Sequence, residues 1–420
     1  MRVLVLNSGS SSQKACLYEI GETLPKHPPA CTWEGKVDFN GNTAAVVVKH
    51  SPGVVRKEQI TFSSREQVVR HLLGTLVEAR GLSPSFKIDV VGHRIVHGGP
   101  HFKDPVIVTP EVRSAITRVS ELAPLHLRAE LESMVLVDSI LNAVPQVAVF
   151  DTGFHRQMPL AASVYPGPYS WFETGIHRYG FHGINHQYCA SRAAQLLGED
   201  PASLKLITCH LGNGCSLAAI SGGRCVDTTM GFTPLDGLMM GTRSGSVDPG
   251  ILIFLMRKSH LDAEQLDHML NNESGLLGVS GLSSDLRDIL AAIQNGNARA
   301  KLAFDIFVHR LQTAIGGMAA VLGGMDALVF TAGMGENSPD LRAAACSTLG
   351  FLGLKINSEL NARPIGDTDI ATADSRVRVL VIRAEEDWSI ATECWKLTHT
   401  NPATTVPPPV RKDSGSLPPR

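Results

Sequence analysis

The sequence has no surplus of charge of either sign. Its 38 Lys and Arg residues are balanced by 40 Asp and Glu residues, which gives a formal net charge of −2. No basic run occurs that would attract nucleic acid. No apolar run approaches the length of a membrane span, and Val3 to Leu6 is too short for a signal peptide. We therefore expect neither nucleic acid nor a membrane as a partner.

Paired cysteines are also missing. The eight cysteines show no C-x-x-C pair and no spacing typical of a disulfide framework. Several of them lie in apolar segments, where a free thiol behaves as a small hydrophobic group. This usage favours a reducing compartment, so we expect a cytoplasmic enzyme.

Length and composition predict a globular chain with more than one domain. With 43% hydrophobic and 19% charged residues, the balance is that of an ordinary globular protein. A chain of 420 residues is too long for one hydrophobic core, so two domains are expected. The Pro-, Ser- and Thr-rich residues 401–420 are expected to form a disordered tail.

The most informative stretch runs from Leu206 to Ile251. Apolar segments alternate with glycine turns, first at Gly212-Asn213-Gly214 and then at Ser221-Gly222-Gly223. This pattern predicts a hairpin whose tip could offer main-chain N–H groups to phosphate oxygens. Arg243, set among glycines and hydroxyl residues, suits the same oxygens. The stretch therefore indicates phosphate binding.

Residues 2–20 repeat this arrangement of strand, Gly/Ser-rich loop and strand. The first strand is expected to end at Asn7, with residues 8–12 as the loop and Lys14 after it. The echo between residues 2–20 and 204–226 predicts two similar domains.

Further apolar strands are expected to lead to Asp151, Gly333 and Glu386 at their ends. Ligands of open α/β sheets bind at the carboxyl ends of strands, so we expect one site that draws on both domains. Carboxylates, an amide and glycine loops are typical of Mg²⁺ with nucleotide phosphates.

Three other motifs are incomplete in this sequence. Zinc at His93 and His97 lacks a third ligand, and Gly333-Met334-Gly335 lacks the third glycine of a dinucleotide fingerprint. Gly35-Lys36 has no glycine five places earlier, so no Walker A loop is present. Arg94, in an otherwise apolar segment, is costly to bury alone and favours a ligand-binding position instead.

Apolar periodicity predicts helices over residues 64–80, 110–122, 128–141, 250–259, 262–270, 286–293 and 300–322, the last largely buried. Ala123-Pro124-Leu125-His126 is expected to lie between two of these helices. Gly333 to Gly335 is expected to form a turn, followed by a helix near Ser338-Pro339.

Seven ordered motifs together resemble the acetate kinase family of the acetate and sugar kinase/heat-shock 70/actin superfamily. They comprise Asn7 to Ser12, Gly92 to Gly99, Phe150 to Thr152, Arg178 to Gly183, His210 to Ser216, Met230 to Pro249 and Phe330 to Ser338. The resemblance spans about residues 2–395. It implies an α/β fold of two duplicated actin-like (ribonuclease H-like) domains around a nucleotide cleft. The expected domains are residues 1–150, completed by a C-terminal helix at about 386–398, and residues 151–385, which would bind nucleotide and dimerise.

The resemblance also implies roles for individual residues. The groups expected to act on the transferring phosphoryl and on the nucleophile are Arg94, Arg243, His182, His126 and Asp151. Arg94 would also bind the substrate carboxylate, and the pocket for the substrate's methyl group would comprise Val96, Leu125, Phe181 and Pro234. Asn7 and Glu386 would lie on the metal side. The nucleotide would contact Ser10, Ser12, Lys14, His210, Leu211, Gly212, Asn213, Gly214, Asp285, Leu286, Arg287, Gly333, Met334, Gly335, Glu336 and Asn337.

The sequence departs from the family pattern at two places. Leu127-Arg128 replaces the usual Asn-Pro after His126, which affects the placement of that histidine. Ala384-Glu385-Glu386-Asp387 replaces Thr-Asn-Glu-Glu, which leaves Glu385 as an alternative to Glu386 at the metal.

The expected reaction is a reversible in-line transfer of the ATP γ-phosphoryl group to acetate, giving acetyl phosphate, a step of acetyl-CoA biosynthesis. Mg²⁺ is expected as cofactor, with Mn²⁺ as an alternative, ATP as co-substrate, and a homodimer as the assembly. Propionate kinase is the nearest alternative, because it shares every motif. An ATP-driven conformational switch of the actin or chaperone type is a second alternative, but it has no need of two arginines.

Overall fold

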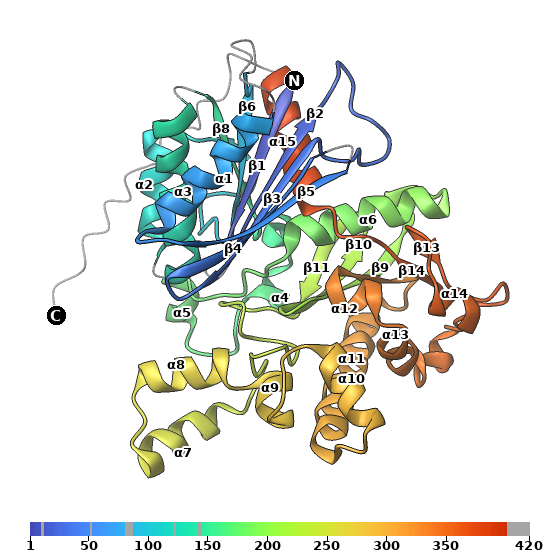
Figure 1. The fold of residues 1–420 in the computed structure, drawn as a ribbon. Coiled ribbons are helices and arrows are strands. Elements are labelled where there is room, and N and C mark those ends of the chain that lie inside the picture. Colours follow the sequence, from blue (N-terminus) through green and yellow to red (C-terminus); the bar gives the residue numbers. More distant parts are fainter. Residues whose placement is uncertain (10–11, 51–52, 80–86, 121–122, 142–143, 401–420) are drawn as a thin grey trace. The chain divides into compact units, whose positions relative to one another are not determined.

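The computed structural model describes residues 1–9, 12–50, 53–79, 87–120, 123–141 and 144–400. The chain divides into two compact units (Figure 1). Unit 1 comprises Met1–Ile95, Asp104–Val149 and Ile390–Arg420, and unit 2 comprises Val96–Lys103 and Phe150–Ser389. The expected tail, residues 401–420, lies outside the described residues.

An eight-stranded sheet forms the centre of unit 1, in the order β5-β4-β3-β2-β1-β6-β8-β7. β1 runs antiparallel to β2 and parallel to β6. On one side of β1 the sheet is therefore an antiparallel meander, and on the other side it begins with a parallel strand reached by a crossover connection. The strands are β1 (Arg2–Ser8), β2 (Ser12–Glu19), β3 (Trp33–Asn40), β4 (Thr43–His50), β5 (Val54–Thr61), β6 (Val90–Ile95), β7 (Val106–Ile107) and β8 (Gln146–Phe150).

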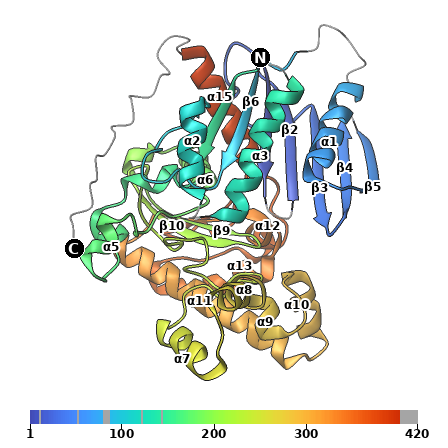
Figure 2. The same cartoon turned by 90° about the vertical axis from the view of Figure 1, so that its left-hand side faces the viewer.

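Helices cover both faces of this sheet because its central strands are apolar on both sides. Leu4, Leu6 and Val91 pack in one core with residues of α1 (Arg65–Ala79) and α3 (Pro124–Leu141). Gly92, the next residue along β6, points the other way, and a Cβ there would collide with Ile390 and Cys394 of α15 (Glu386–Thr400). Since successive strand residues face opposite sides, α15 lies on the face away from α1 and α3 (Figure 2). α2 (Pro110–Arg118) packs against α3.

Unit 2 is built on a six-stranded sheet in the order β11-β10-β9-β12-β14-β13. β9 runs antiparallel to β10 and parallel to β12, which is itself parallel to β14. The strands are β9 (Lys205–Leu211), β10 (Cys215–Ser221), β11 (Arg224–Thr228), β12 (Ala327–Thr331), β13 (Thr368–Asp369) and β14 (Arg378–Val381).

Two long helices cover the opposite faces of the unit 2 sheet (Figure 1). α6 (Gly183–Leu197) contributes alanines to a core with Leu206 and Ile220, while α11 (Ala298–Leu322) buries Phe307, Leu311 and Ile315. The remaining helices are α4 (Leu160–Ser163), α5 (Tyr169–Glu173), α7 (Pro249–Ser259), α8 (Ala263–Asn272), α9 (Gly275–Ser280), α10 (Leu286–Gln294), α12 (Ala332–Asn337), α13 (Pro339–Cys346) and α14 (Ser358–Ala362), with short 3-10 turns η2 (Gly153–Gln157), η3 (Pro201–Ser203) and η4 (Leu349–Leu352).

The two sheets share one topology. The order β3-β2-β1-β6-β8 in unit 1 matches β11-β10-β9-β12-β14 in unit 2, and β1 and β9 each have one antiparallel and one parallel neighbour. The repeat expected from residues 2–20 and 204–226 is therefore a repeat of structure. The expected α/β fold of two duplicated domains is confirmed.

Three local expectations were wrong. Ala123-Pro124-Leu125-His126 does not separate two helices, because α3 already begins at Pro124, where proline suits a first helical turn. Gly333 to Gly335 lies inside the short helix α12, since Ala332 takes the left-handed backbone conformation (φ 64°) that turns the chain. Leu302 of α11, expected to be buried, is 52% exposed.

Among the described residues, no helix is both long enough and apolar enough to cross a membrane.

Candidate functional site

In unit 1, polar residues gather where three neighbouring strands end. Asn7 on β1 pairs with Lys14 on β2, so the two side chains share a face of the sheet. The parallel register of β1 and β6 runs to the pair Leu6–His93, which puts Arg94 beside Asn7 one residue later. All three side chains are half-buried. A cation, an amide and a second cation thus line one sheet edge.

The loop after β1 is held from both sides within unit 1. Ser8 Oγ lies 2.9 Å from Ser133 Oγ of α3, and both residues are buried. Arg65, at the start of α1, donates from Nη2 to the carbonyl oxygens of Gly9 and Ser12, while its guanidinium lies 4.3 Å above the ring centre of Phe39. Ser10 lies outside the described residues.

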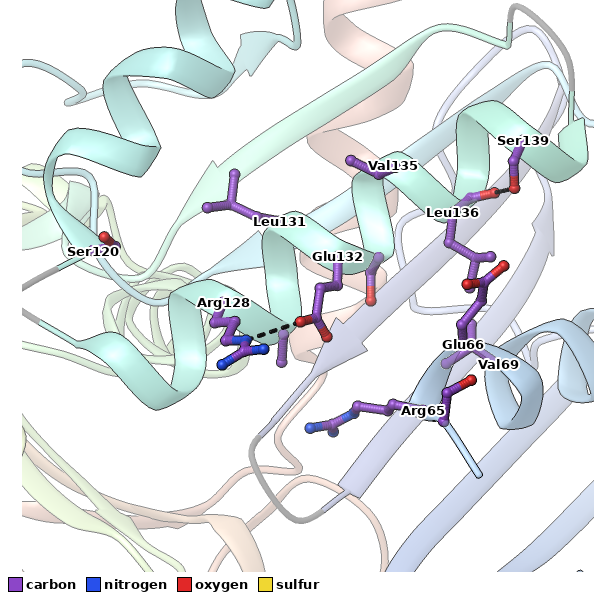
Figure 3. A pocket seen from close by; sticks show the side chains of 13 residues that line it. Arg65, Glu66, Val69, Ser120, Arg128, Leu131, Glu132, Val135, Leu136 and Ser139 are labelled. Carbon is purple, nitrogen blue, oxygen red and sulfur yellow. Dashed lines mark hydrogen bonds and ion pairs between the residues drawn. The ribbon is translucent and has the colours of Figure 1, made fainter. Parts of the chain in front are cut away.

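Arg65 also lines a cavity of about 990 Å³ between α1 and α3 (Figure 3). Arg128 donates from Nε to Glu132 Oε1 at 3.0 Å, and Arg65 points toward the same cavity. Arg128 is 82% exposed at its side chain, whereas Leu127 is fully buried. The two residues that depart from the family pattern therefore act as a core residue and a surface ion-pair residue. Leu125 and His126 lie in the first turn of α3, and their side chains lie outside the description.

In unit 2, Asp151 fixes the start of α6. Its carboxylate Oδ2 accepts the His182 backbone N–H at 2.9 Å, and its carbonyl accepts the Gly183 N–H at 2.8 Å. His182 adopts a left-handed backbone conformation with φ 57°. A Cβ on Gly183 would overlap the Asp151 carbonyl oxygen, so only glycine fits after His182.

The His182 ring lies in a buried polar network. Its Nδ1 is 2.8 Å from Ser216 Oγ, which is also 2.8 Å from His186 Nε2. The ring stacks on His210, with 3.9 Å between ring centres, and Asn185 Nδ2 lies 2.8 Å from His210 Nδ1. Two predicted site histidines, His182 and His210, are thus brought together.

Gly214 at the tip of the β9–β10 hairpin lies beside both His182 and Arg243. A Cβ on Gly214 would be 3.5 Å from His182 Nε2 and 3.5 Å from Arg243 Nη1. Arg243 Nη1 also donates to the Pro234 carbonyl at 3.0 Å. A histidine nitrogen and a guanidinium therefore flank a position that has no side chain.

The hairpin tip also contacts the segment that carries Arg243. The Gly241 N–H donates to the Asn213 carbonyl at 3.0 Å, and a Cβ on Gly241 would overlap the Asn213 side chain. This close approach requires glycine at position 241.

Two residues of the expected methyl pocket, Val96 and Phe181, are buried in unit 2. Val96 is 4% and Phe181 is 1% exposed. His97 packs edge-on against Phe181 and Tyr179, with ring centres 5.7 and 4.3 Å away. Its Nδ1 accepts the Gly99 N–H at 2.8 Å. Phe181 therefore packs against His97, which is neutral at pH 7 because burial lowers its pKa to about 3.

The residues expected on the adenosine side fall into two groups in unit 2. Asp285 caps α10 and forms an ion pair with Arg287, whose side chain is 90% exposed. Gly333 to Asn337 form α12, where Arg342, fully buried, donates to the carbonyls of Gly335 and Glu336. Sequence reasoning missed Arg342, because nothing near it in the sequence indicates that its partners are main-chain oxygens.

The acidic segment before α15 places its two glutamates differently. Glu386 Oε1 lies 4.0 Å from His210 Nδ1, and Glu336 Oε1 accepts the Ala384 N–H at 2.8 Å. Glu385 lies near Tyr188 instead. Burial is the main cause of the raised pKa of Tyr188, and the negative charges of Asp367 and Glu385 raise that pKa further. No group of three or more His, Cys, Asp or Glu side chains suited to a metal ion occurs in the part of the chain that the structure describes.

The duplicated sheets, the glycine hairpin and the paired cation and histidine define the chain as a phosphoryl-transfer enzyme of the actin-like class. A family model described as the acetokinase family matches residues 2–392. The chain belongs to the acetokinase family.

Known proteins agree with this assignment over nearly the whole chain. The acetate kinase of Trichormus variabilis is 57% identical over 406 residues, covering 95% of this chain and all of that protein. The acetate kinase of Gloeobacter violaceus is 54% identical, with 94% and 99% covered. The crystal structure of Porphyromonas gingivalis acetate kinase superposes with a TM-score of 0.87 at 39% identity, covering 94% of this chain and 99% of that one. A propionate kinase from Francisella tularensis superposes with a TM-score of 0.86 at 36% identity, covering 93% and 98%.

Buried histidines predict a loss of stability in mild acid. Burial lowers the pKa of His93 and His155 to about 4 and that of His97 to about 3. In the unfolded chain a histidine protonates near pH 6.5. Below that pH the unfolded state binds more protons, so stability present at pH 7 is lost as pH falls toward 4, by about 2 kcal/mol per histidine between pH 7 and 5.

We therefore expect the urea midpoint at pH 5 to lie well below that at pH 7. His155→Gln, which can still donate to the Phe181 carbonyl, should reduce the difference. The exposed His309, changed to Gln, is the control. Equal midpoints of the unmodified protein at both pH values would contradict the assignment of neutral histidines.

Proposed function

We propose that the chain is an acetate kinase that transfers the γ-phosphoryl group of ATP to acetate, reversibly, to give acetyl phosphate and ADP. The observation that carries this proposal is that Arg243 Nη1 and His182 Nε2 both lie beside Gly214 at the tip of the β9–β10 hairpin, because a guanidinium and an imidazole are groups that donate to phosphate oxygens. Acetokinase family membership supports the same activity.

The chemistry needs positioning and charge stabilisation more than proton transfer. Acetate is already an anionic nucleophile at neutral pH, so no general base is required to activate it. In phosphoryl transfer, charge is spread over the equatorial oxygens of the moving group. Arg94, Arg243 and His182 would donate to those oxygens, and Asp151 would hold His182 in place through its backbone.

Arg94 would in addition orient the acetate carboxylate, with Val96, Phe181, Pro234 and Leu125 around the methyl group. His126, in the first turn of α3, would add a donor on the phosphate side. The first loop, with Ser10, Ser12 and Lys14, and the second, from His210 to Gly214, would bind ATP phosphates. Asp285 to Arg287 and Gly333 to Asn337 would contact the adenosine.

Mg²⁺ fits the oxygen groups available, with Mn²⁺ as an alternative. Asn7 offers an amide oxygen and Glu386 a carboxylate whose side chain is 19% exposed. We favour Glu386 over Glu385, because Glu386 faces His210 of the phosphate-binding hairpin. When bound with ATP, the ion would neutralise phosphate charge.

Propionate kinase remains the alternative, because a propionate kinase of known structure is also similar. A conformational switch of the actin type is not favoured, since the chain belongs to a family of small-molecule kinases. Purified enzyme assayed with acetate and propionate tests the assignment.

We also infer a cytoplasmic homodimer. All eight cysteines are free, which suits a reducing compartment. α7 buries none of its residues, although Ile251, Ile253, Phe254 and Met256 are all about half exposed. Ile251 and Phe254, three positions apart, share one face of the helix, and exposed apolar side chains of this kind are typical of a subunit interface.

The two arginines should act mainly on the chemical step. We expect Arg94→Ala and Arg243→Ala each to lower kcat by on the order of a hundredfold, because each removes a donor that strengthens in the transition state. Arg56→Ala, which removes a surface cation of β5, should leave kcat unchanged. An unchanged kcat with only a raised acetate KM would reduce their role to carboxylate binding.

Val96 should set the size of the acyl pocket. The additional methylene of propionate improves the binding free energy by about 1 kcal/mol where it fits, and costs about 1–3 kcal/mol where it must displace packed side chains. We expect acetate to be preferred over propionate by roughly ten- to a hundredfold in kcat/KM. Val96→Ala should narrow that difference through a lower propionate KM. A wild-type preference for propionate would favour the alternative function.

The apolar face of α7 should hold the dimer together. Light scattering should give twice the chain mass of 45.0 kDa for the unmodified protein and a monomer for Phe254→Glu combined with Ile251→Glu. Val55→Glu, a comparably exposed position on β5, is the control and should stay dimeric. A dimeric α7 variant would place the interface elsewhere.

A further inference from the structure

Four side chains of unit 2 form a hydrogen-bonded chain that ends at His182. Thr208 Oγ1 of β9 lies 2.7 Å from His186 Nδ1, His186 Nε2 lies 2.8 Å from Ser216 Oγ of β10, and Ser216 Oγ lies 2.8 Å from His182 Nδ1. Thr208, His186 and Ser216 are each 0% exposed. Solvent therefore cannot supply or accept these protons.

Thr208, at the far end of this hydrogen-bond series, determines which atom donates in each of the hydrogen bonds. Its hydroxyl hydrogen needs an acceptor, and among the described residues the His186 ring is the only hydrogen-bond partner of Thr208 Oγ1. If His186 donated to Thr208 instead, the buried hydroxyl hydrogen would be left unsatisfied, which costs about 1–3 kcal/mol. Thr208 is therefore the donor and His186 Nδ1 the acceptor.

Because His186 Nδ1 is an acceptor, the tautomer of His186 is also determined. Burial lowers the pKa of His186 well below its ordinary value, and the neighbouring rings of His155 and His210 lower it further. A neutral imidazole carries one N–H. With Nδ1 accepting, that proton is on Nε2, which donates to Ser216 Oγ.

Ser216 in turn determines which nitrogen of His182 is protonated. Its oxygen already accepts from His186, so its own hydrogen goes to the other ring nitrogen within reach, His182 Nδ1. His182 Nδ1 is then an acceptor, and the ring proton of a neutral His182 is on Nε2. That nitrogen is the one beside Gly214 and Arg243 Nη1.

We propose that Thr208, His186 and Ser216 are positioning residues that fix His182 as its Nε2–H tautomer, so that Nε2 donates to an oxygen of the transferring phosphoryl group. The identity of that oxygen rests on the proposed function, whereas the tautomer does not. In the other tautomer, with the proton on Nδ1, the lone pair of His182 Nε2 would face the phosphoryl oxygen and repel it.

Thr208→Val tests the chain at its far end, three hydrogen bonds from His182. The substitution keeps the shape of the side chain and removes the donor, so both His182 tautomers become accessible. We expect kcat to fall by roughly three- to tenfold, with the KM values for acetate and ATP unchanged. Thr208→Ser, which keeps the hydroxyl, should recover most of kcat. Thr75→Val, which removes a buried hydroxyl in unit 1, is the matched control.

Nitrogen-15 NMR of histidine-labelled protein reads the tautomer without any activity. The His182 resonances, assigned by their loss in His182→Gln, should show a protonated Nε2 and an unprotonated Nδ1. Ser216→Ala should abolish this preference, and it supplies the decisive variant if Thr208→Val does not fold.

A protonated Nδ1 on His182 at neutral pH, or an unchanged kcat in both Thr208→Val and Ser216→Ala, would overturn the proposal. Equal losses in Thr208→Val and Thr208→Ser would also overturn it, because they would point to packing. If the unmodified protein fails to phosphorylate acetate but shows the Nε2–H tautomer, the proposed function fails and the positioning role stands.

Discussion

The two hydrogen bonds that Asp151 accepts from the backbone N–H groups of His182 and Gly183 are the constraint on which the start of α6 and the orientation of His182 depend. They hold a non-glycine residue in the left-handed conformation, which normally costs of order 1 kcal/mol or more. The strain is sustained because Asp151 is fully buried at the end of β8 and cannot move away. Starting α6 at this point turns the His182 ring toward Ser216 and Gly214, and the same helix then supplies Asn185 and His186 one turn later. Asp151, through its carboxylate and its main-chain carbonyl, thus fixes the start of the helix that carries all three side chains.

The duplicated sheets give the same scaffold two different loops. In both units an apolar central strand joins an antiparallel partner through a hairpin, but the first hairpin is rich in serine with Lys14 after it, and the second is rich in glycine. The glycine hairpin depends on close backbone approach, as Gly241 against Asn213 shows, whereas the serine loop is held by side chains, with Arg65 on its carbonyls and Ser133 on Ser8. The duplication therefore conserves topology while each loop is fixed by its own contacts.

Much of this could be predicted from the sequence, because strand ends and glycine turns are local signals. The hairpin at Gly212 to Gly214, the helix over residues 64–80 and the repeat of residues 2–20 all depend on short-range pattern. The predicted start of α3 at residue 128 was wrong, because proline is equally typical of a loop and of a first helical turn, and the helix begins at Pro124. The partners of Arg342, and the chain from Thr208 to His182, could not be found in this way. Arg342 donates to main-chain carbonyls, which no residue type in the sequence indicates. The side chains from Thr208 to His182 come from different strands and helices, and hydrogen bonds between residues more than twenty positions apart leave no periodic trace.

The neutrality of the buried histidines agrees with a reaction in which no proton has to move. A base catalyst needs a pKa near the working pH, yet burial lowers the pKa values of His97, His155 and His186 far below that range. Such rings serve as fixed dipoles, each with one donor and one acceptor whose directions are set by their partners. Fixed dipoles stabilise developing charge without reorganising, which is the more useful property when the nucleophile is already ionised. In the proposed mechanism, the positive charge that the moving phosphoryl group requires would come from arginine, which stays protonated even when partly desolvated, and His182 would contribute an oriented N–H donor instead of a charge.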